Sequence, residues 1–266
     1  MPGLIRGIDP MPTPFMHLQF AERIKGNLNA SNEIDGRWSM LKAELWPAFY
    51  FGSVAPDYQS ICGVERQLTH FYGLPPAPDN EAYPRMLAQY PQLAPASRLP
   101  AEQAWFVAAY SVHLMLDLIW FREILVPSFY NAPHLGDMHQ RHLLHLILLT
   151  YLDKLAIETL PDFAGSTLSE AQPQRWLPFA TDGQLRNWRD FLVAQLQPGG
   201  MLQTIQIYAG RLQMTAGEFA AKLDNPEWMQ EHLFARVPVT AVQERLVAAV
   251  PASIQLVDDY LNNRFA

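Results

Sequence analysis

The sequence predicts an all-α fold, built as a multi-helix bundle. Apolar residues recur at three- and four-residue intervals, which places them on one face of a helix, and the alternation typical of strands is scarce. The 22 prolines punctuate these helical stretches. Because 49% of the 266 residues are hydrophobic, the chain can bury a substantial core.

The first half of the chain is expected to begin with two helices. One is predicted over residues 15–24, with Gly26 just past its end, and the other over residues 37–51. Pro47 predicts a bend or restart in the second helix, because proline lacks a backbone donor and crowds the preceding turn. A short helix is expected near Met86, within a proline-rich stretch.

The longest helical run is predicted over residues 101–126, ended by Pro127. It is apolar nearly all round, which is typical of a buried helix. A further apolar helix is expected over residues 141–160, and about four amphipathic helices over residues 175–266.

Composition excludes several classes of function. The formal net charge is −7 and no run of Lys or Arg occurs, so we expect no nucleic-acid partner. With Cys62 as the single cysteine, any tight metal site must use histidines and carboxylates. No signal-peptide pattern and no uncharged apolar segment of about 18 residues is found, so we expect no transmembrane segment and a cytoplasmic protein. The oligomeric state is left open.

The first candidate for chemistry is His113-Leu-Met-Leu-Asp117, on the predicted buried helix. Four residues apart, the two side chains share a helix face and can bind one ion, or the carboxylate can bridge two. A buried ionised aspartate is costly unless a cation accompanies it. The alternatives are a buried His–Asp hydrogen bond or an Asp117 held by a distant arginine.

Two other segments add candidate ligands. Asp57 lies on a predicted loop, and His70 follows thirteen residues later in Thr-His-Phe-Tyr. Taken separately, a loop aspartate is typical of an Asx turn, and a histidine among aromatic residues is typical of a satisfied core residue.

Together with His17 at the start of the first helix, these residues resemble, in order and spacing, the zinc-dependent phospholipase C family, whose all-helical fold is shared with the S1/P1-type nucleases. The resemblance covers about residues 11–155. It implies one zinc ion held by four residues: Asp57, His70, His113 and Asp117. It also implies that Asp117 bridges to another ion and that His17 helps to bind a neighbouring ion.

The remaining region, residues 156–266, has no counterpart in this resemblance. We expect it to be a C-terminal helical extension that packs on the metal-binding core, residues 1–155, as one globular unit. Trp188 and Trp228 are candidates for lining an apolar cleft, with core packing as the alternative.

The second zinc site of the resembled family is altered in this sequence. Glu123 stands where the family has a histidine, and it is a competent zinc ligand; the alternative is an ion pair with Arg122 or with another helix. For the later ligands of that site the candidates are His145 and then His142, although neither is followed by the family's glutamate. A hydrogen-bonded core or surface histidine is the alternative for each.

The functional hypothesis is a zinc-dependent phosphoester hydrolase similar to phospholipase C, using one to three zinc ions and metal-activated water. Asp57 would orient or deprotonate the water, and the substrate would be a small-molecule or lipid phosphoester. One alternative is a zinc-stabilised binding or scaffold protein with a degenerate active site. A second alternative is an S1/P1-like nuclease.

Overall fold

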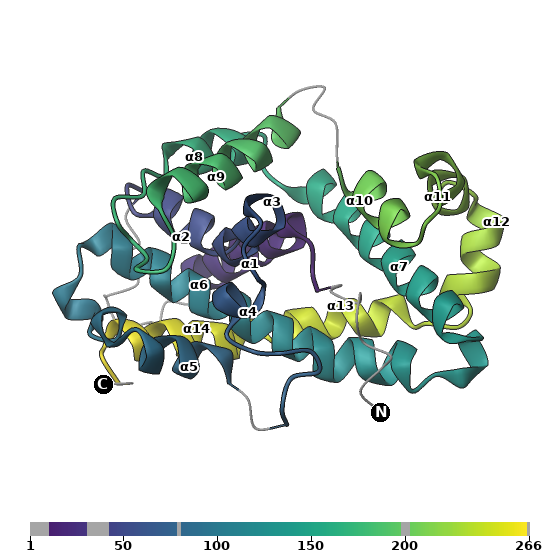
Figure 1. Ribbon diagram of the computed structural model, residues 1–266, viewed down its shortest axis with the longest axis horizontal. Helices are drawn as coiled ribbons and strands as arrows, with labels where there is room; N and C mark the ends of the chain where they lie inside the picture. Colours follow the sequence, from purple (N-terminus) through teal and green to yellow (C-terminus); the bar gives the residue numbers. More distant parts are fainter. Residues whose placement is uncertain (1–10, 31–42, 79–80, 198–202, 265–266) are drawn as a thin grey trace.

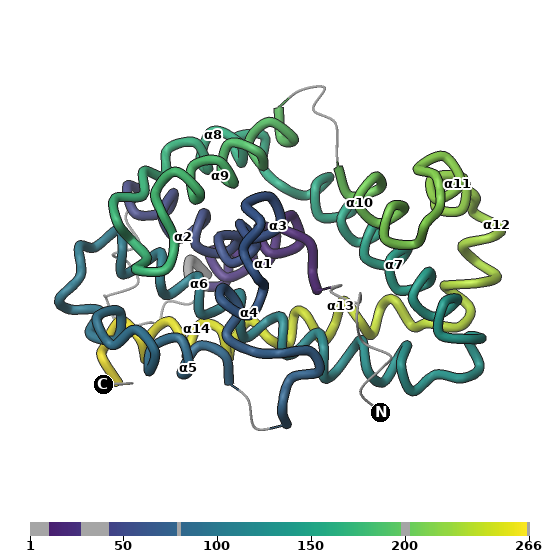
Figure 2. Tube along the Cα trace, in the orientation of Figure 1, coloured from purple at the N-terminus to yellow at the C-terminus, as the bar shows by residue number. Residues whose placement is uncertain are grey.

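The computed structural model describes residues 11–30, 43–78, 81–197 and 203–264, and within these ranges every regular element is helical (Figures 1 and 2). The predicted all-α, multi-helix fold is therefore confirmed. The first elements are α1 (Pro14–Ala30), α2 (Trp46–Gly52), η2 (Ala55–Tyr58), α3 (Gln59–Cys62), α4 (Gln67–His70), α5 (Ala82–Gln89), η3 (Pro91–Leu93), η4 (Ala96–Arg98), α6 (Ala101–Ile119), η5 (Trp120–Tyr130), η6 (Pro133–Leu135) and α7 (Met138–Thr159). The later ones are α8 (Ala164–Glu170), α9 (Asp182–Leu196), α10 (Thr204–Arg211), α11 (Ala216–Leu223), α12 (Pro226–Met229), η7 (Gln230–Phe234), α13 (Val239–Ala248) and α14 (Val250–Leu261).

Helix α6 forms the centre of the bundle. It packs against α2, α5 and α14, and most of its side chains are buried. In Figure 1, α14 runs below α6, while α8 and α9 cover α2 from the opposite side. Helix α7 packs against α1, α10 and α11. The helices that follow residue 156 thus pack on those that precede it, and the core draws on both halves of the chain.

Two predicted helix ends, at Gly26 and at Pro127, are wrong, and one predicted restart is confirmed. Helix α1 continues through Gly26 to Ala30, since a glycine inside a helix costs only about 1 kcal/mol relative to alanine and does not by itself end the helix. Helix α2 begins at Trp46, which confirms the restart expected at Pro47, since a proline in the first turn needs no backbone donor. Residues 37–42 of the predicted helix lie outside the described part of the chain. After α6 the chain continues as the π-helical η5, and Pro127 lies inside it. Hydrogen bonds in a π-helix join residues five apart, so the carbonyl that Pro127 leaves without a donor differs from that in an α-helix.

Residues 101–130 form a helical run that is long and apolar enough, by length and composition, to cross a membrane. Within its most apolar window, 89% of the residues are buried inside the bundle. A helix that is apolar nearly all round must be covered by other helices, and this burial confirms the buried helix predicted for this region.

Candidate metal centre

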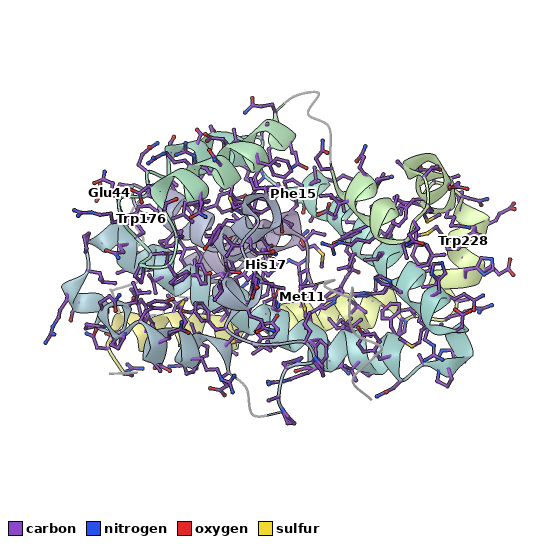
Figure 3. The ribbon with its side chains drawn as sticks, in the orientation of Figure 1. Met11, Phe15, His17, Glu44, Trp176 and Trp228 are labelled. Carbon is purple, nitrogen blue, oxygen red and sulfur yellow. The ribbon has the colours of Figure 1, made fainter. Side chains whose placement is uncertain are left out.

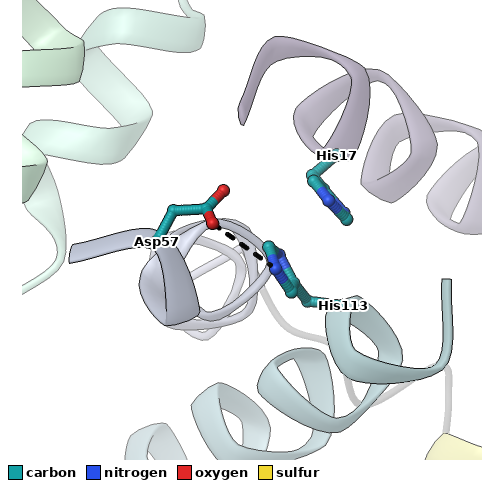
Figure 4. Close-up of side chains that lie close together, drawn as sticks. All are labelled: His17, Asp57 and His113. Atoms are coloured by element: carbon teal, nitrogen blue, oxygen red, sulfur yellow. Dashed lines mark ion pairs between the residues drawn. The ribbon is translucent and has the colours of Figure 1, made fainter. Parts of the chain in front are cut away.

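Five residues predicted as metal ligands come together in the interior of the protein. His17 comes from the first turn of α1, Asp57 from η2 and His70 from α4, while His113 and Asp117 lie one turn apart on α6. Figure 3 shows His17 in the middle of the molecule, and Figure 4 shows Asp57 and His113 pointing toward one another with His17 beside them. The four histidine and aspartate side chains other than Asp57 are at most 2% exposed.

Four donor atoms form a compact group at the centre of this cluster. Nε2 of His70 lies 3.4 Å from Oδ1 of Asp57 and 3.5 Å from Oδ2 of Asp117. Nε2 of His113 lies 3.9 Å and 3.8 Å from the same two oxygens. Two overlapping sets, His17 with Asp57 and His113, and His70 with His113 and Asp117, each have donor atoms close enough to share one cation. The buried His/Asp groups of this cluster could therefore hold a metal ion.

His17 extends the group on one side. Its Nε2 lies 3.3 Å from Oδ1 of Asp117, and its ring stacks on that of His113 with centroids 3.8 Å apart. Nε2 of His17, Nε2 of His113 and Oδ1 of Asp117 are all buried without a hydrogen-bond partner in the described part of the chain. Buried polar atoms are nearly always satisfied, and a cation held among these atoms would satisfy all three, so they fit a metal ligand set.

Two histidines of the cluster, His70 and His113, are held at Nδ1, the ring nitrogen that faces away from the cluster. Nδ1 of His113 lies 2.8 Å from the carbonyl oxygen of Ser53 and must carry the proton, since a carbonyl only accepts. Nδ1 of His70 lies 2.7 Å from Oγ1 of Thr69. For His113 the tautomer leaves the Nε2 lone pair directed at the cluster, as in metal-bound histidines whose other nitrogen is held by a carbonyl.

Close packing of α2 on α6 makes the His113 contact possible. A Cβ added to Gly52 would lie 2.3 Å from the carbonyl oxygen of Phe106 and 2.9 Å from Cβ of Ala109. Only glycine allows α2 to lie this close to α6, and this packing places the Ser53 carbonyl next to His113. On the neighbouring side, the Tyr110 hydroxyl donates to the carbonyl of Thr69 at 2.6 Å and ties α4 to α6.

Arg66 and Tyr72, which sequence reasoning did not name, hold Oδ2 of Asp117, the oxygen that also faces His70 and His113. The arginine matches the alternative of an Asp117 held by a distant arginine. Nη2 of Arg66 lies 2.7 Å from Oδ2 of Asp117, and the Tyr72 hydroxyl donates to the same oxygen at 3.0 Å. Arg66 precedes α4, and its carbonyl accepts from the amide of His70 at 2.8 Å. An Arg-x-x-x-His spacing beside a candidate ligand was the available signal, because residues four apart share a helix face.

The protonation states suit a cation. Burial lowers the pKa of His113 to about 3, with further contributions from neighbouring histidines, so this imidazole is neutral with a lone pair. Burial opposes ionisation of Asp117, but the surrounding imidazoles and the Arg66 guanidinium outweigh it and hold the pKa of this carboxyl below its usual range. Burial raises the pKa of Asp57; His113 opposes this rise and the Asp117 carboxylate adds to it.

A cavity of about 310 Å³ opens beside the cluster, between the start of α1, the α3 segment, α9 and α10. Asp57, whose side chain is 16% exposed, and Arg66 both line it. Trp188 also lines this cavity and donates from Nε1 to the carbonyl of Val54 at 2.7 Å, which anchors the segment that carries Asp57. Trp228 lies elsewhere, on a different cavity formed partly by α7 and η6.

The residues predicted for a second metal site are not among these close donors. Glu123 is half exposed, and its Oε2 forms an ion pair with Nη1 of Arg245 on α13 at 3.1 Å. This matches the alternative of an ion pair with another helix. The π-helical turn that begins at Trp120 changes the direction of residues beyond it, because its rotation per residue is smaller than that of an α-helix.

The two α7 histidines also have other surroundings. Nε2 of His145 accepts a hydrogen bond from Nε1 of Trp120 at 3.1 Å, and the His145 ring contacts Phe129. Burial lowers the pKa of His145, and it lowers the pKa of His142 to about 4, assisted by Arg211. Both imidazoles are therefore neutral, and His145 matches the alternative of a hydrogen-bonded core histidine.

Comparison with known proteins leaves the site to be judged on its own geometry: no family model, curated protein or solved structure matches this chain.

Proposed function

We propose that this protein is a zinc-dependent phosphoester hydrolase similar to phospholipase C. The observation that carries the proposal is the close approach of His70 and His113 to Asp57 and Asp117, with Asp57 at the wall of a cavity that also presents a guanidinium. A purely structural ion would not need its ligand Asp57 to reach such a cavity.

The spacing of the donors supports zinc. Zinc binds imidazole nitrogen and carboxylate oxygen at about 2.0–2.1 Å, so neighbouring ligands of a tetrahedral ion lie about 3.3–3.4 Å apart. The four separations between a histidine Nε2 and a carboxylate oxygen, from 3.4 to 3.9 Å, lie close to this spacing. The ligand types also exclude a preference for Mg²⁺ or Ca²⁺, which favour oxygen donors alone.

The charge of the cluster supports a divalent ion as well. With both carboxylates ionised, as metal ligands are, Asp57 and Asp117 carry two negative charges against the one positive charge of the Arg66 guanidinium, which leaves a net charge of −1 on these three groups. Leaving such a charge buried is costly. A divalent cation reverses the sign to a net positive charge, which suits an anionic substrate.

Bound zinc would lower the pKa of a coordinated water toward 7 and neutralise charge on a phosphoryl oxygen. Around it, each side chain has a separate role. His70 and His113 would hold the ion, with their orientation set by Thr69 and Ser53. Asp57 would orient the attacking water or accept its proton, because it is the ligand at the cavity wall.

The lining of the cavity favours a substrate with an apolar part. Aromatic and aliphatic side chains make up much of its wall: Met11, Phe15, Ile61, Trp188, Phe191 and Ile207. Binding sites for small molecules commonly combine such walls with a few placed polar groups. A lipid phosphoester, or another phosphoester with an apolar group, fits this combination.

A zinc-stabilised binding or scaffold protein is the second candidate, because one specific observation favours it. Four protein ligands complete a tetrahedral shell, as in structural zinc sites, whereas catalytic sites usually keep one position for water. The enzyme proposal therefore needs the shell to expand, or Asp57 to leave it, when substrate enters the cavity.

Metal counting and turnover on one preparation separate the candidates. We expect purified full-length protein to contain at least one zinc per chain and to hydrolyse an apolar phosphodiester, with activity lost on chelation and restored by zinc. One zinc per chain without turnover on lipid, nucleotide or synthetic phosphodiesters would favour the scaffold. Faster turnover on single-stranded nucleic acid than on lipid phosphodiesters would favour a nuclease, and absence of any bound metal would refute both zinc proposals.

A further inference from the structure

We infer that Arg66 is the substrate-binding cation of this centre, contacting the phosphoryl group beside the metal as well as holding Asp117. The inference rests on the proposed function and adds a residue that the ligand pattern does not contain. Its starting observation is that one side chain reaches both the buried carboxylate and the cavity wall.

Several contacts hold the guanidinium in a fixed position. Its Nη2 contacts Oδ2 of Asp117 at 2.7 Å and the Tyr72 hydroxyl at 2.6 Å. The group also lies over the Tyr72 ring, with Cζ 4.6 Å from the ring centroid. An arginine held by such contacts is pre-organised, so little rotamer entropy is lost when another group binds to it.

Arg66 is also the group that gives the centre an excess of positive charge. A divalent ion and the two carboxylates Asp57 and Asp117 cancel, leaving the guanidinium as the net charge. Because Arg66 is 11% exposed and lines the same cavity as Asp57, an anion that reaches the metal through this cavity also meets Arg66. Arginine binds phosphoryl oxygens through charge-assisted, often bidentate hydrogen bonds.

Tyr72 provides the matched control. It donates to the same Asp117 oxygen at 3.0 Å and is 2% exposed, but it does not line the cavity. Tyr72→Phe therefore removes one support of Asp117 while keeping the cation. If Arg66 acted only by supporting Asp117, the two substitutions would have similar effects on anion binding.

The test measures zinc content and the Kd for inorganic phosphate, by calorimetry, on zinc-loaded full-length protein. We expect Arg66→Gln to keep its zinc and to bind phosphate ~10- to 100-fold more weakly, as loss of a charge-assisted contact predicts. Arg66→Lys should recover part of the affinity, and Tyr72→Phe should stay within about threefold of the unaltered protein.

Three results would overturn the inference while the zinc proposal survives. They are unchanged phosphate affinity in zinc-loaded Arg66→Gln, an equal loss in Tyr72→Phe, and a loss in Arg66→Gln that disappears once the amount of bound zinc is taken into account. Failure of the unaltered protein to bind zinc is a different outcome, because it overturns the proposed function and the inference together. Thermal unfolding of each variant identifies any that has lost its fold, in which case Arg66→Lys decides by the same phosphate measurement.

Discussion

Nδ1 of His113 donates to the backbone carbonyl of Ser53 at 2.8 Å, joining the central helix α6 to the residue that follows α2. A backbone carbonyl cannot be removed by substitution, so the contact depends on how closely the two helices pack. The position of Gly52 controls that distance, since its Cα faces the carbonyl of Phe106. The orientation of His113, a candidate ligand, therefore depends on Gly52, which is not itself a candidate ligand.

Gly52→Ala should weaken both the fold and the metal site. An added Cβ would lie 2.3 Å from the Phe106 oxygen, so α2 must move away from α6. We expect a loss of about 1–3 kcal/mol in the free energy of unfolding, as for other overpacked cores. Urea denaturation measures this loss, and titration with zinc should show weaker binding because Ser53 shifts relative to His113.

Gly26→Ala is the matched control, because nothing lies within 4 Å of a Cβ at this position in α1. Alanine favours the helix by up to about 1 kcal/mol over glycine, so this variant should be unchanged or more stable. If Gly52→Ala proved as stable as Gly26→Ala, close packing of α2 on α6 could not explain the position of Ser53.

Asp117→Asn should abolish metal binding and, with it, any hydrolysis. Asp117 is the fully buried carboxylate that faces His17, His70 and His113, and an amide is a poor substitute for an anionic ligand. Because changes to residues that only support ligands cost about 10–100-fold in metal affinity, loss of a ligand should cost more than about 100-fold. Elemental analysis and competition with a zinc-binding dye measure this change.

Glu123→Gln provides the comparison for Asp117→Asn. Glu123 is half exposed and paired with Arg245, an ion pair of the kind that contributes at most about 1 kcal/mol. We expect full metal content, full activity and nearly unchanged stability. A drop in zinc content in this variant would show that Glu123 serves a second ion and would revive the sequence-based assignment.

Asp153 should make stability fall with rising pH. Its carboxylate oxygens accept from the hydroxyls of Thr13 and Thr204, but burial dominates and raises its pKa from 3.8 to about 6. Between these values the folded state binds more protons than the unfolded chain, so the free energy of unfolding decreases as pH rises from about 4 to 6. The shift corresponds to about 3 kcal/mol by pH 7.

Asp153→Asn should remove that part of the pH dependence, which urea denaturation from pH 4 to 8 can measure as the difference between the two proteins. Thr204→Val takes away one of the two hydroxyl donors and should make the decrease larger and extend it to higher pH, because the ionised form loses support and the folded-state pKa rises. Parallel stability curves for Asp153→Asn and the unaltered protein would contradict a raised pKa at this position.

Phe191→Ala should reduce the preference for apolar substrates. Phe191 lines the cavity beside Asp57 and stacks on Trp188 with ring centroids 5.5 Å apart. Loss of the ring should raise KM for a long-chain phosphodiester about tenfold and leave a short-chain one nearly unchanged. Phe163→Ala, an exposed phenylalanine that does not line this cavity, should change neither value. An equal effect on both substrates would place the apolar group elsewhere.

Helical periodicity was enough to predict the class of the fold, the buried nature of α6 and the shared face of His113 and Asp117. These are local properties: residues four apart lie together on any α-helix, and an all-round apolar helix must be covered. The same logic failed at Pro127, where the helix continues as a π-helix, and at Gly26, which lies inside α1.

What only the tertiary structure decided is which side chains meet. His17, Asp57 and His70 are brought to α6 by helix packing, which no spacing rule measures, although the family resemblance anticipated their grouping. Arg66 joins them because α4 lies against α6, whereas Glu123 pairs with Arg245 on α13, from a part of the chain more than a hundred residues away. Sequence determines local direction, but the distances between segments depend on how their buried surfaces fit together.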